Sequence, residues 1–288
     1  MGAVFLSTIL YVLFVVISVY MAGNLLVATL SYMFYWYEVF NNGREFGHDP
    51  ELPKLPSDLA RICFYEWLVQ AIIYLYCRIE RLGFLRTEIG ANLANEKPPV
   101  LFVHGWLHSP GGWRPLMAKL ASRRKNRRLF TVDLAPAFRS IPDYAQTLHL
   151  RIEEVRRLTG HAKVVLVGHS MGGLIIREYL ATRGVDKVER VAALGSPFAG
   201  TTLGAFSFSR DARQMTRNSD YLQTLAKDES YKKIPFKSIY SVHDNLVIPF
   251  WSSRLDGADN IALGEMGHSG LLWDEGVAAV LEGVIYED

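Results

Sequence analysis

The sequence predicts an α/β protein, a mostly parallel sheet with helices on both faces, preceded by an N-terminal region of apolar helices. From residue 100 onward, short apolar runs of strand type alternate with helical patterns, which is typical of a buried parallel sheet. Residues 2–37 contain no Asp, Glu, Lys or Arg. Residues 164–173, VVLVGHSMGG, end a buried strand in a glycine-rich turn. The net charge of +2 gives no reason to expect nucleic-acid binding.

The uncharged N-terminal segment is longer than a core helix requires and predicts a membrane anchor. No Lys or Arg precedes the segment and no A-x-A site follows it, which disfavours a signal peptide. One straight helix of this length would span about 54 Å, against a hydrocarbon core of about 30 Å. Met21-Ala22-Gly23-Asn24 therefore predicts a break, giving a helical hairpin within residues 1–40 with spans near 3–21 and 25–40. A single, steeply tilted helix is the alternative.

Aromatic residues gather at the end of the second expected span, where they would form a belt at the membrane surface: Tyr32, Tyr35, Trp36 and Tyr37. Residues 41–97 are expected to form a linker followed by an amphipathic, interfacial helix. Residues 41–57 contain three prolines and predict the linker. In the apolar stretch that follows, Glu66 precedes an uncharged run of only 11 residues from Trp67 to Cys77, which is short for a membrane span. Packing of this helix on the catalytic domain is the alternative.

Residues 98–288 are expected to form one catalytic domain. Its strands are predicted within residues 100–105, 127–134, 163–170, 188–197, 236–242 and 260–265, each a short apolar run. Its helices are predicted at residues 110–124, 142–159, 173–183 and 273–285, from apolar residues at helical spacing. Pro142 stands near the start of the second of these helices, a favoured position for proline.

The turn at Ser170 has two interpretations. Glycines after a strand can bind a phosphate at the next helix N-terminus, or they can allow a strained turn that exposes a nucleophile. The stretch lacks both nucleotide-binding glycine patterns, but Gly168, Ser170 and Gly172 fit G-x-S-x-G. A serine hydroxyl is a weak nucleophile and needs a base that a carboxylate orients. In folds with this turn, the acid and then the histidine follow the serine along the chain.

Two downstream residues fit that order. Asp244 directly follows an apolar strand, whereas Asp256 and Asp259 lie in a polar loop and Asp133 precedes the serine. His268 follows the next strand and is the last histidine of the chain. Because ligands bind at the carboxyl ends of parallel strands, these positions predict a Ser170, Asp244 and His268 triad.

An acyl-transfer site also requires two backbone N–H groups that stabilise an oxyanion. Met171, directly after the serine, and Trp106, in the loop after the first catalytic-domain strand, are the expected donors. No Cys, His or carboxylate cluster has metal-ligand spacing, so no metal or other cofactor is expected for the chemistry.

Five ordered motifs, VHGW, VGHSMGG, ALGSPFAGT, HDNLVIP and GHSGLL, resemble those of bacterial triacylglycerol lipases with the α/β-hydrolase fold, over roughly residues 98–286. The resemblance implies Ser170 as nucleophile, His268 as general base and acid, and Asp244 as the residue that orients it. It implies Trp106 and Met171 as oxyanion donors, and hydrolysis of carboxylic esters with longer acyl chains. Some such lipases hold a structural calcium ion near the histidine, but no full ligand set matches here.

We therefore expect a serine ester hydrolase anchored in a membrane, the bacterial inner membrane, with a lipid substrate such as an acylglycerol or a phospholipid. An acyl thioesterase, an acyltransferase or a catalytically silent membrane scaffold of the same fold are the alternatives. The side of the membrane that the catalytic domain faces stays open. Residues 198–235 occupy the usual site of a lid, and a mobile lid and a fixed wall are equally compatible with the sequence.

Overall fold

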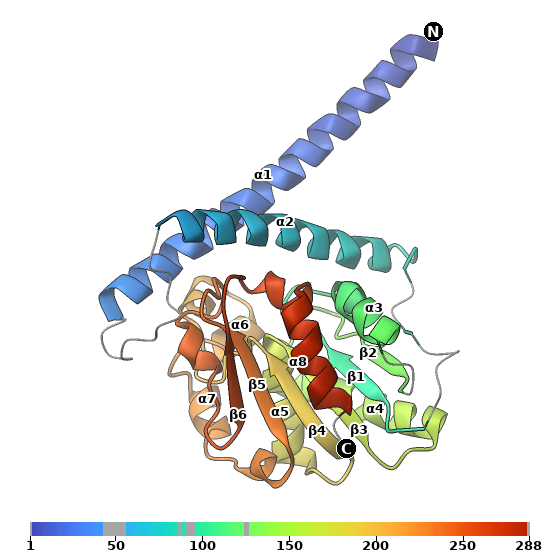
Figure 1. Cartoon of the computed structure of the whole chain (residues 1–288), viewed down its shortest axis with the longest axis vertical. Helices are drawn as coiled ribbons and strands as arrows, with labels where there is room; N and C mark the ends of the chain where they lie inside the picture. Colours follow the sequence, from blue (N-terminus) through green and yellow to red (C-terminus); the bar gives the residue numbers. More distant parts are fainter. Residues whose placement is uncertain (1, 43–55, 86–87, 90–95, 124–126, 287–288) are drawn as a thin grey trace.

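The computed structural model describes residues 2–42, 56–85, 88–89, 96–123 and 127–286. Most of the expected linker, residues 43–55, lies outside the described residues. Two long helices precede a catalytic domain with a central sheet, and α2 crosses above one end of that sheet (Figure 1).

Six strands form the sheet, all parallel, in the spatial order β2-β1-β3-β4-β5-β6. They are β1 (Val100–Val103), β2 (Leu129–Val132), β3 (Val164–His169), β4 (Val188–Leu194), β5 (Phe236–Ser241) and β6 (Asp259–Leu263). The central strands are buried on both faces, which explains their continuous apolar runs. The predicted α/β class, a parallel sheet, is confirmed.

Helices cover both faces of the sheet. On one face, α4 (Ile141–Thr159) and α5 (Met171–Arg183) pack against side chains such as Leu166. On the other, α3 (Arg114–Arg123) and α8 (Glu275–Tyr286) pack against neighbours such as Val167. Shorter elements follow the strands: α6 (Arg210–Gln214), α7 (Asp220–Leu225), η2 (Pro110–Trp113), η3 (Thr202–Phe206), η4 (Ser230–Lys233), η5 (Phe250–Ser253) and η6 (Ser269–Leu272).

The expected helical hairpin is wrong, because α1 (Gly2–Asn42) is one continuous helix. The supposed break at residues 21–24 is where α2 crosses α1. The Asn24 side chain donates to the Tyr20 carbonyl one turn back, so it stays within the helix. The Trp67 indole donates to the Met21 carbonyl at 3.0 Å. Side chains of α2 thus hydrogen-bond to α1 at the positions where a turn was expected.

The second half of α1 packs on the catalytic domain along one face. Its buried positions are Ala28, Ser31, Tyr32, Tyr35 and Glu38, which share one helix face. The Tyr35 hydroxyl donates to the Val242 carbonyl at 2.8 Å. The expected aromatic belt is therefore wrong for Tyr32 and Tyr35, whose rings belong to the core. In the first half, residues 5–19 are all exposed, and Figure 1 shows this half extending away from the domain.

The helix α2 (Pro56–Arg81) crosses α1 and packs on the catalytic domain. One face is buried, with Ile62, Glu66, Val69 and Ile73 almost inaccessible to solvent. The other face exposes large apolar side chains: Phe64, Leu68 and Leu75. One face of α2 thus packs on the protein, as the alternative interpretation expected. The opposite apolar face, here called the open face, is exposed. By length and composition both helices are able to cross a membrane.

Candidate active site

Ser170 lies in a sharp turn between β3 and α5. Its φ of 56° is unusual for a residue with a side chain and costs roughly 1–3 kcal/mol, so the surroundings must hold it. Its N–H donates to the Leu194 carbonyl at 2.8 Å. A Cβ on Gly168 would lie 2.7 Å from the carbonyl carbon of Gly172, and one on Gly172 would collide with the Val103 carbonyl. The flanking glycines therefore allow the turn that lifts Ser170 to the end of the sheet.

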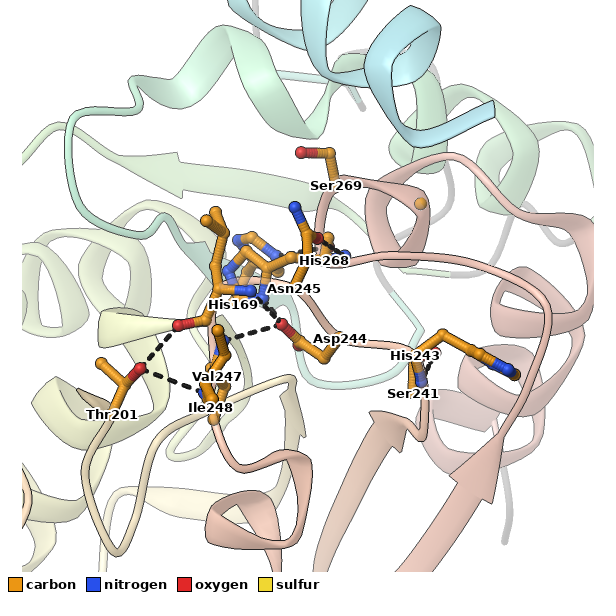
Figure 2. A network of polar contacts seen from close by, with 12 residues as sticks. His169, Thr201, Ser241, His243, Asp244, Asn245, Val247, Ile248, His268 and Ser269 are labelled. Atoms are coloured by element: carbon orange, nitrogen blue, oxygen red, sulfur yellow. Dashed lines mark hydrogen bonds and ion pairs between the residues drawn. The ribbon is translucent and has the colours of Figure 1, made fainter. Parts of the chain in front are cut away.

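His268 and Asp244 form a direct hydrogen bond, with 2.7 Å between Nδ1 and Oδ2. Both side chains are buried, and each follows its own strand, β6 and β5. The other carboxylate oxygen, Oδ1, accepts the N–H groups of Leu246 and Val247 at 2.9 and 2.8 Å. Figure 2 shows Asp244 between its own loop and His268. One oxygen thus fixes the loop while the other orients the histidine.

The proton arrangement of His268 follows from this contact. A carboxylate only accepts, so Nδ1 carries the hydrogen and Nε2 of the neutral ring is free to take a proton. Burial acts to lower the pKa of His268, but the Asp244 carboxylate and its hydrogen bond outweigh burial, and Glu66 adds to the increase. The pKa of His268 is therefore raised above its ordinary value, as suits a general base.

Ser170 and His268 line one cavity of about 150 Å³, here called the Ser170 cavity, and Trp106 borders it as well. Its other walls come from both N-terminal helices and from the segments after β4 and β5: Val27, Tyr74, Leu203, Ala212, Met215 and Val247 among them. Part of the 198–235 segment is thus a wall of the cavity.

The two expected oxyanion donors flank Ser170. Met171 is the first residue of α5, so its N–H belongs to the first turn, where donors lack partners within the helix. Trp106 follows Gly105, whose Cβ would lie only 2.8 Å from the Ser170 Cβ, so this backbone lies directly against the serine. The structure therefore brings all five predicted site residues to one end of the sheet.

Comparisons with known proteins agree with this arrangement. A family model described as the alpha/beta hydrolase fold matches residues 98–224. The chain adopts the α/β-hydrolase fold. It is similar to a Bacillus licheniformis lipase, with 20% identity over 68% of this chain and 95% of that one and a TM-score of 0.60. It is also similar to lipase B of Aspergillus fumigatus, with 20% identity over 69% of this chain and 56% of that one and a TM-score of 0.61. A Rhodococcus esterase matches at 17% identity over 69% of this chain and 93% of that one, with a TM-score of 0.50.

Neutral histidines surround the triad residues of this hydrolase fold. His169 stacks on His108, with ring centroids 5.6 Å apart, and its ring lies 4.5 Å from that of His268. Burial lowers the pKa of His108 to about 3 and the pKa of His169 well below its ordinary value. Burial likewise lowers the pKa of His104, which follows β1, to about 4. These rings place no positive charge beside His268.

Three residues near His268 were not assigned a role from the sequence. Asn245 accepts the His268 N–H, and Glu66 of α2 accepts the N–H groups of Ser269 and Gly270. Gly195 lies beside the pair, since its Cβ would be 3.0 Å from Asp244 Oδ2. Only Asn245 carried a local signal, because it is a polar residue directly after Asp244.

The structural calcium of some lipases does not fit here. Among the residues that the structure describes, no group of three or more His, Cys, Asp or Glu side chains is placed to hold a metal ion. The carboxylates nearest His268, those of Asp244 and Glu66, already accept N–H donors. We assign no step to a metal.

Proposed function

We propose that this chain is a membrane-anchored serine hydrolase that cleaves carboxylic esters of long-chain acyl lipids. One observation carries the proposal. The hydrogen-bonded Asp244–His268 pair and the strained Ser170 meet at one cavity, in the arrangement that serine ester hydrolases require.

In the proposed reaction, Ser170 Oγ attacks the ester carbonyl carbon and gives its proton to His268 Nε2. Asp244 holds the ring and stabilises the imidazolium, while the Trp106 and Met171 N–H groups stabilise the negative oxygen. The intermediate collapses when the C–O bond breaks and His268 protonates the leaving alcohol. Water, deprotonated by His268, then attacks the acyl-serine, and release of the fatty acid restores Ser170 with its proton.

The cavity supports a lipid as the substrate. A second cavity of about 660 Å³ shares Val27, Tyr74 and His108 with the Ser170 cavity, so the two adjoin. Both receive walls from α1 and α2. An acyl chain that lies along these helices is buried from water while its ester group reaches Ser170. Burial of each CH₂ group contributes about 0.8 kcal/mol to the binding free energy.

The exposed apolar surface of the helices supports the anchor. Residues 5–19 of α1 are exposed, and the open face of α2 presents Phe64, Leu68 and Leu75. We place the first half of α1 in the bilayer and the open face of α2 at its surface. The test is flotation of the purified full chain with phospholipid vesicles. Co-flotation that resists high salt and carbonate supports insertion, and protein left in the soluble fraction refutes it.

Catalysis is tested with a fluorophosphonate probe and with glycerolipid and acyl-CoA substrates, assayed separately in vesicles. We expect the wild type and the matched surface variant Ser122→Ala to be labelled and to release fatty acid from the glycerolipid. Ser170→Ala should lose labelling and on the order of 10³-fold or more in kcat. Release from acyl-CoA alone would indicate a thioesterase, and transfer to an added alcohol would indicate an acyltransferase. A folded wild type that is not labelled would indicate a silent scaffold.

The walls that α1 contributes allow a test of chain length. Val27→Trp adds a large side chain where α1 borders both cavities. We expect kcat/KM for esters of long acyl chains to fall about tenfold or more, with acetyl and butyryl esters much less affected. An equal fall in kcat/KM for esters of all chain lengths would show that α1 does not line the path of the acyl chain.

A further inference from the structure

The loop that carries His268 is held from outside the hydrolase domain. Its three successive backbone N–H groups, those of His268, Ser269 and Gly270, all donate to side chains. The acceptors are Asn245 for the first and Glu66 for the other two. Because η6 begins at Ser269, these N–H groups stand at the start of a helical turn, where no acceptor exists within the helix.

Glu66 belongs to α2 and has no solvent exposure. Its Oε1 lies 2.6 Å from the Ser269 nitrogen and its Oε2 lies 3.0 Å from the Gly270 nitrogen, so the carboxylate spans both donors. The loop closes tightly around it, because a Cβ on Gly267 would lie 2.5 Å from the Glu66 carboxyl carbon. A buried carboxylate is costly unless it is hydrogen-bonded, so this contact requires α2 and the His268 loop to be docked together.

The second contact runs through α1. Asn245 Oδ1 accepts the His268 N–H at 3.1 Å, and Asn245 Nδ2 donates to Ser31 Oγ at 2.7 Å. The Ser31 hydroxyl in turn donates to the Ala28 carbonyl at 2.9 Å. Ser31, Asn245 and His268 are all buried, so water does not compete for these bonds. Figure 2 shows Asn245 beside His268.

We propose that Glu66 and Ser31 are positioning residues for His268, so that both N-terminal helices form part of the catalytic machinery. Glu66 fixes the peptide groups that follow the histidine, and Ser31 orients the Asn245 amide that fixes the histidine's own N–H. Activity then depends on the docking of α1 and α2, which a membrane anchor alone would not require. This inference rests on the proposed function.

Glu66 also acts on the charge state of His268. The titratable groups around the His268 ring are Asp244 from the loop after β5, Glu66 from α2, His169 from the end of β3 and His108, also neutral, from the loop after β1. His169 is neutral, so the two carboxylates are the charges that favour the imidazolium. Loss of the Glu66 charge should therefore lower the pKa of His268 and move the acid limb of kcat/KM to lower pH. A residue that merely stabilised the fold would leave that limb in place.

The experiment compares full-length variants in vesicles. Glu66→Gln keeps the shape but sets an amide donor against a backbone N–H, and we expect kcat to fall about 10–100-fold with little change in KM. Ser31→Ala should lower kcat several-fold, and Ser31→Thr, which keeps the hydroxyl, should restore it. Trp67→Phe and Glu38→Gln are matched controls, since each removes one helix contact that does not touch the His268 loop.

The outcomes separate this inference from the proposed function. If the wild type releases no fatty acid from any ester, the proposed function fails. If the wild type is active but Glu66→Gln keeps its kcat and acid limb, or loses activity only as much as the controls do, the positioning role is overturned. If Glu66→Gln does not fold, the Ser31→Ala and Ser31→Thr pair decides: equal activity in both overturns the role of α1 in positioning.

Discussion

Replacement of Gly195 by alanine tests whether the Asp244–His268 contact governs the rate. Gly195 directly follows β4 with a φ of 53°, and its N–H donates to the Ile239 carbonyl at 2.8 Å. An added Cβ would lie 3.0 Å from Asp244 Oδ2 and 3.3 Å from His268 Nδ1. These are the two atoms of the triad hydrogen bond, so the methyl group presses on the bond itself.

The expected size of the effect follows from this geometry. Ordinary van der Waals contact requires a few tenths of an ångström more, and the added Cβ would also lie only 2.7 Å from Leu271 Cδ1, so three neighbours must move. Displacement of catalytic groups on this scale should lower kcat by about 10²-fold. The positive φ costs an alanine about 1–2 kcal/mol of stability in addition.

Gly160→Ala is the matched control. Gly160 ends α4 with a φ of 76°, and a Cβ there would meet no atom within 4 Å. An alanine at this position loses a similar amount of stability through its positive φ, but it lies far from the site. The assay is steady-state ester hydrolysis at a temperature at which circular dichroism shows each variant to be folded. We expect a low kcat for Gly195→Ala alone, and equal kcat values for the two variants would refute the argument that the triad bond is compressed.

Two further predictions concern ionisation. Asp244→Asn should lower kcat by on the order of 10⁴-fold, because the amide no longer fixes the tautomer of His268, and near-normal turnover would show that another residue is the acid partner. Burial lowers the pKa of His104 and His243 to about 4 and that of His108 to about 3, so the unfolded chain binds more protons than the native state between about pH 6.5 and 4. Stability should therefore fall by about 1–2 kcal/mol per buried histidine from pH 7 to pH 5, opposed by His268 and Glu66, whose pKa values are raised in the native state, and urea denaturation at the two pH values measures it.

The sequence alone predicted the sheet, and it placed Ser170, Asp244 and His268 at the end of that sheet, because these signals are local. Each strand is a buried apolar run, and Ser170, Asp244 and His268 each follow one of them in a fixed order. Because the carboxyl ends of parallel strands lie at the same edge of a sheet, residues that follow different strands meet there, and no long-range information was required to place them.

The N-terminal region was harder to predict because its structure depends on distant partners. Gly23 and Asn24 favour a turn in isolation, but contacts with α2 keep them helical. Tyr32 and Tyr35 have the composition of a membrane belt, and only packing against Ile248 and its neighbours makes them core. Glu66 interrupts an apolar run, which suggested the polar side of an interfacial helix, whereas the N–H groups that donate to its carboxylate lie about 200 residues downstream.

The contact between Glu66 and Ser269 also has a consequence for how the protein is made. The two residues are 203 positions apart, so α1 and α2 leave the ribosome long before the segment that completes the site. The carboxylate has no native partner until β6 and η6 have been synthesised and the loop has closed over it. We therefore expect the two N-terminal helices to form first and the site around His268 to be completed last, once the C-terminal segment folds back onto them.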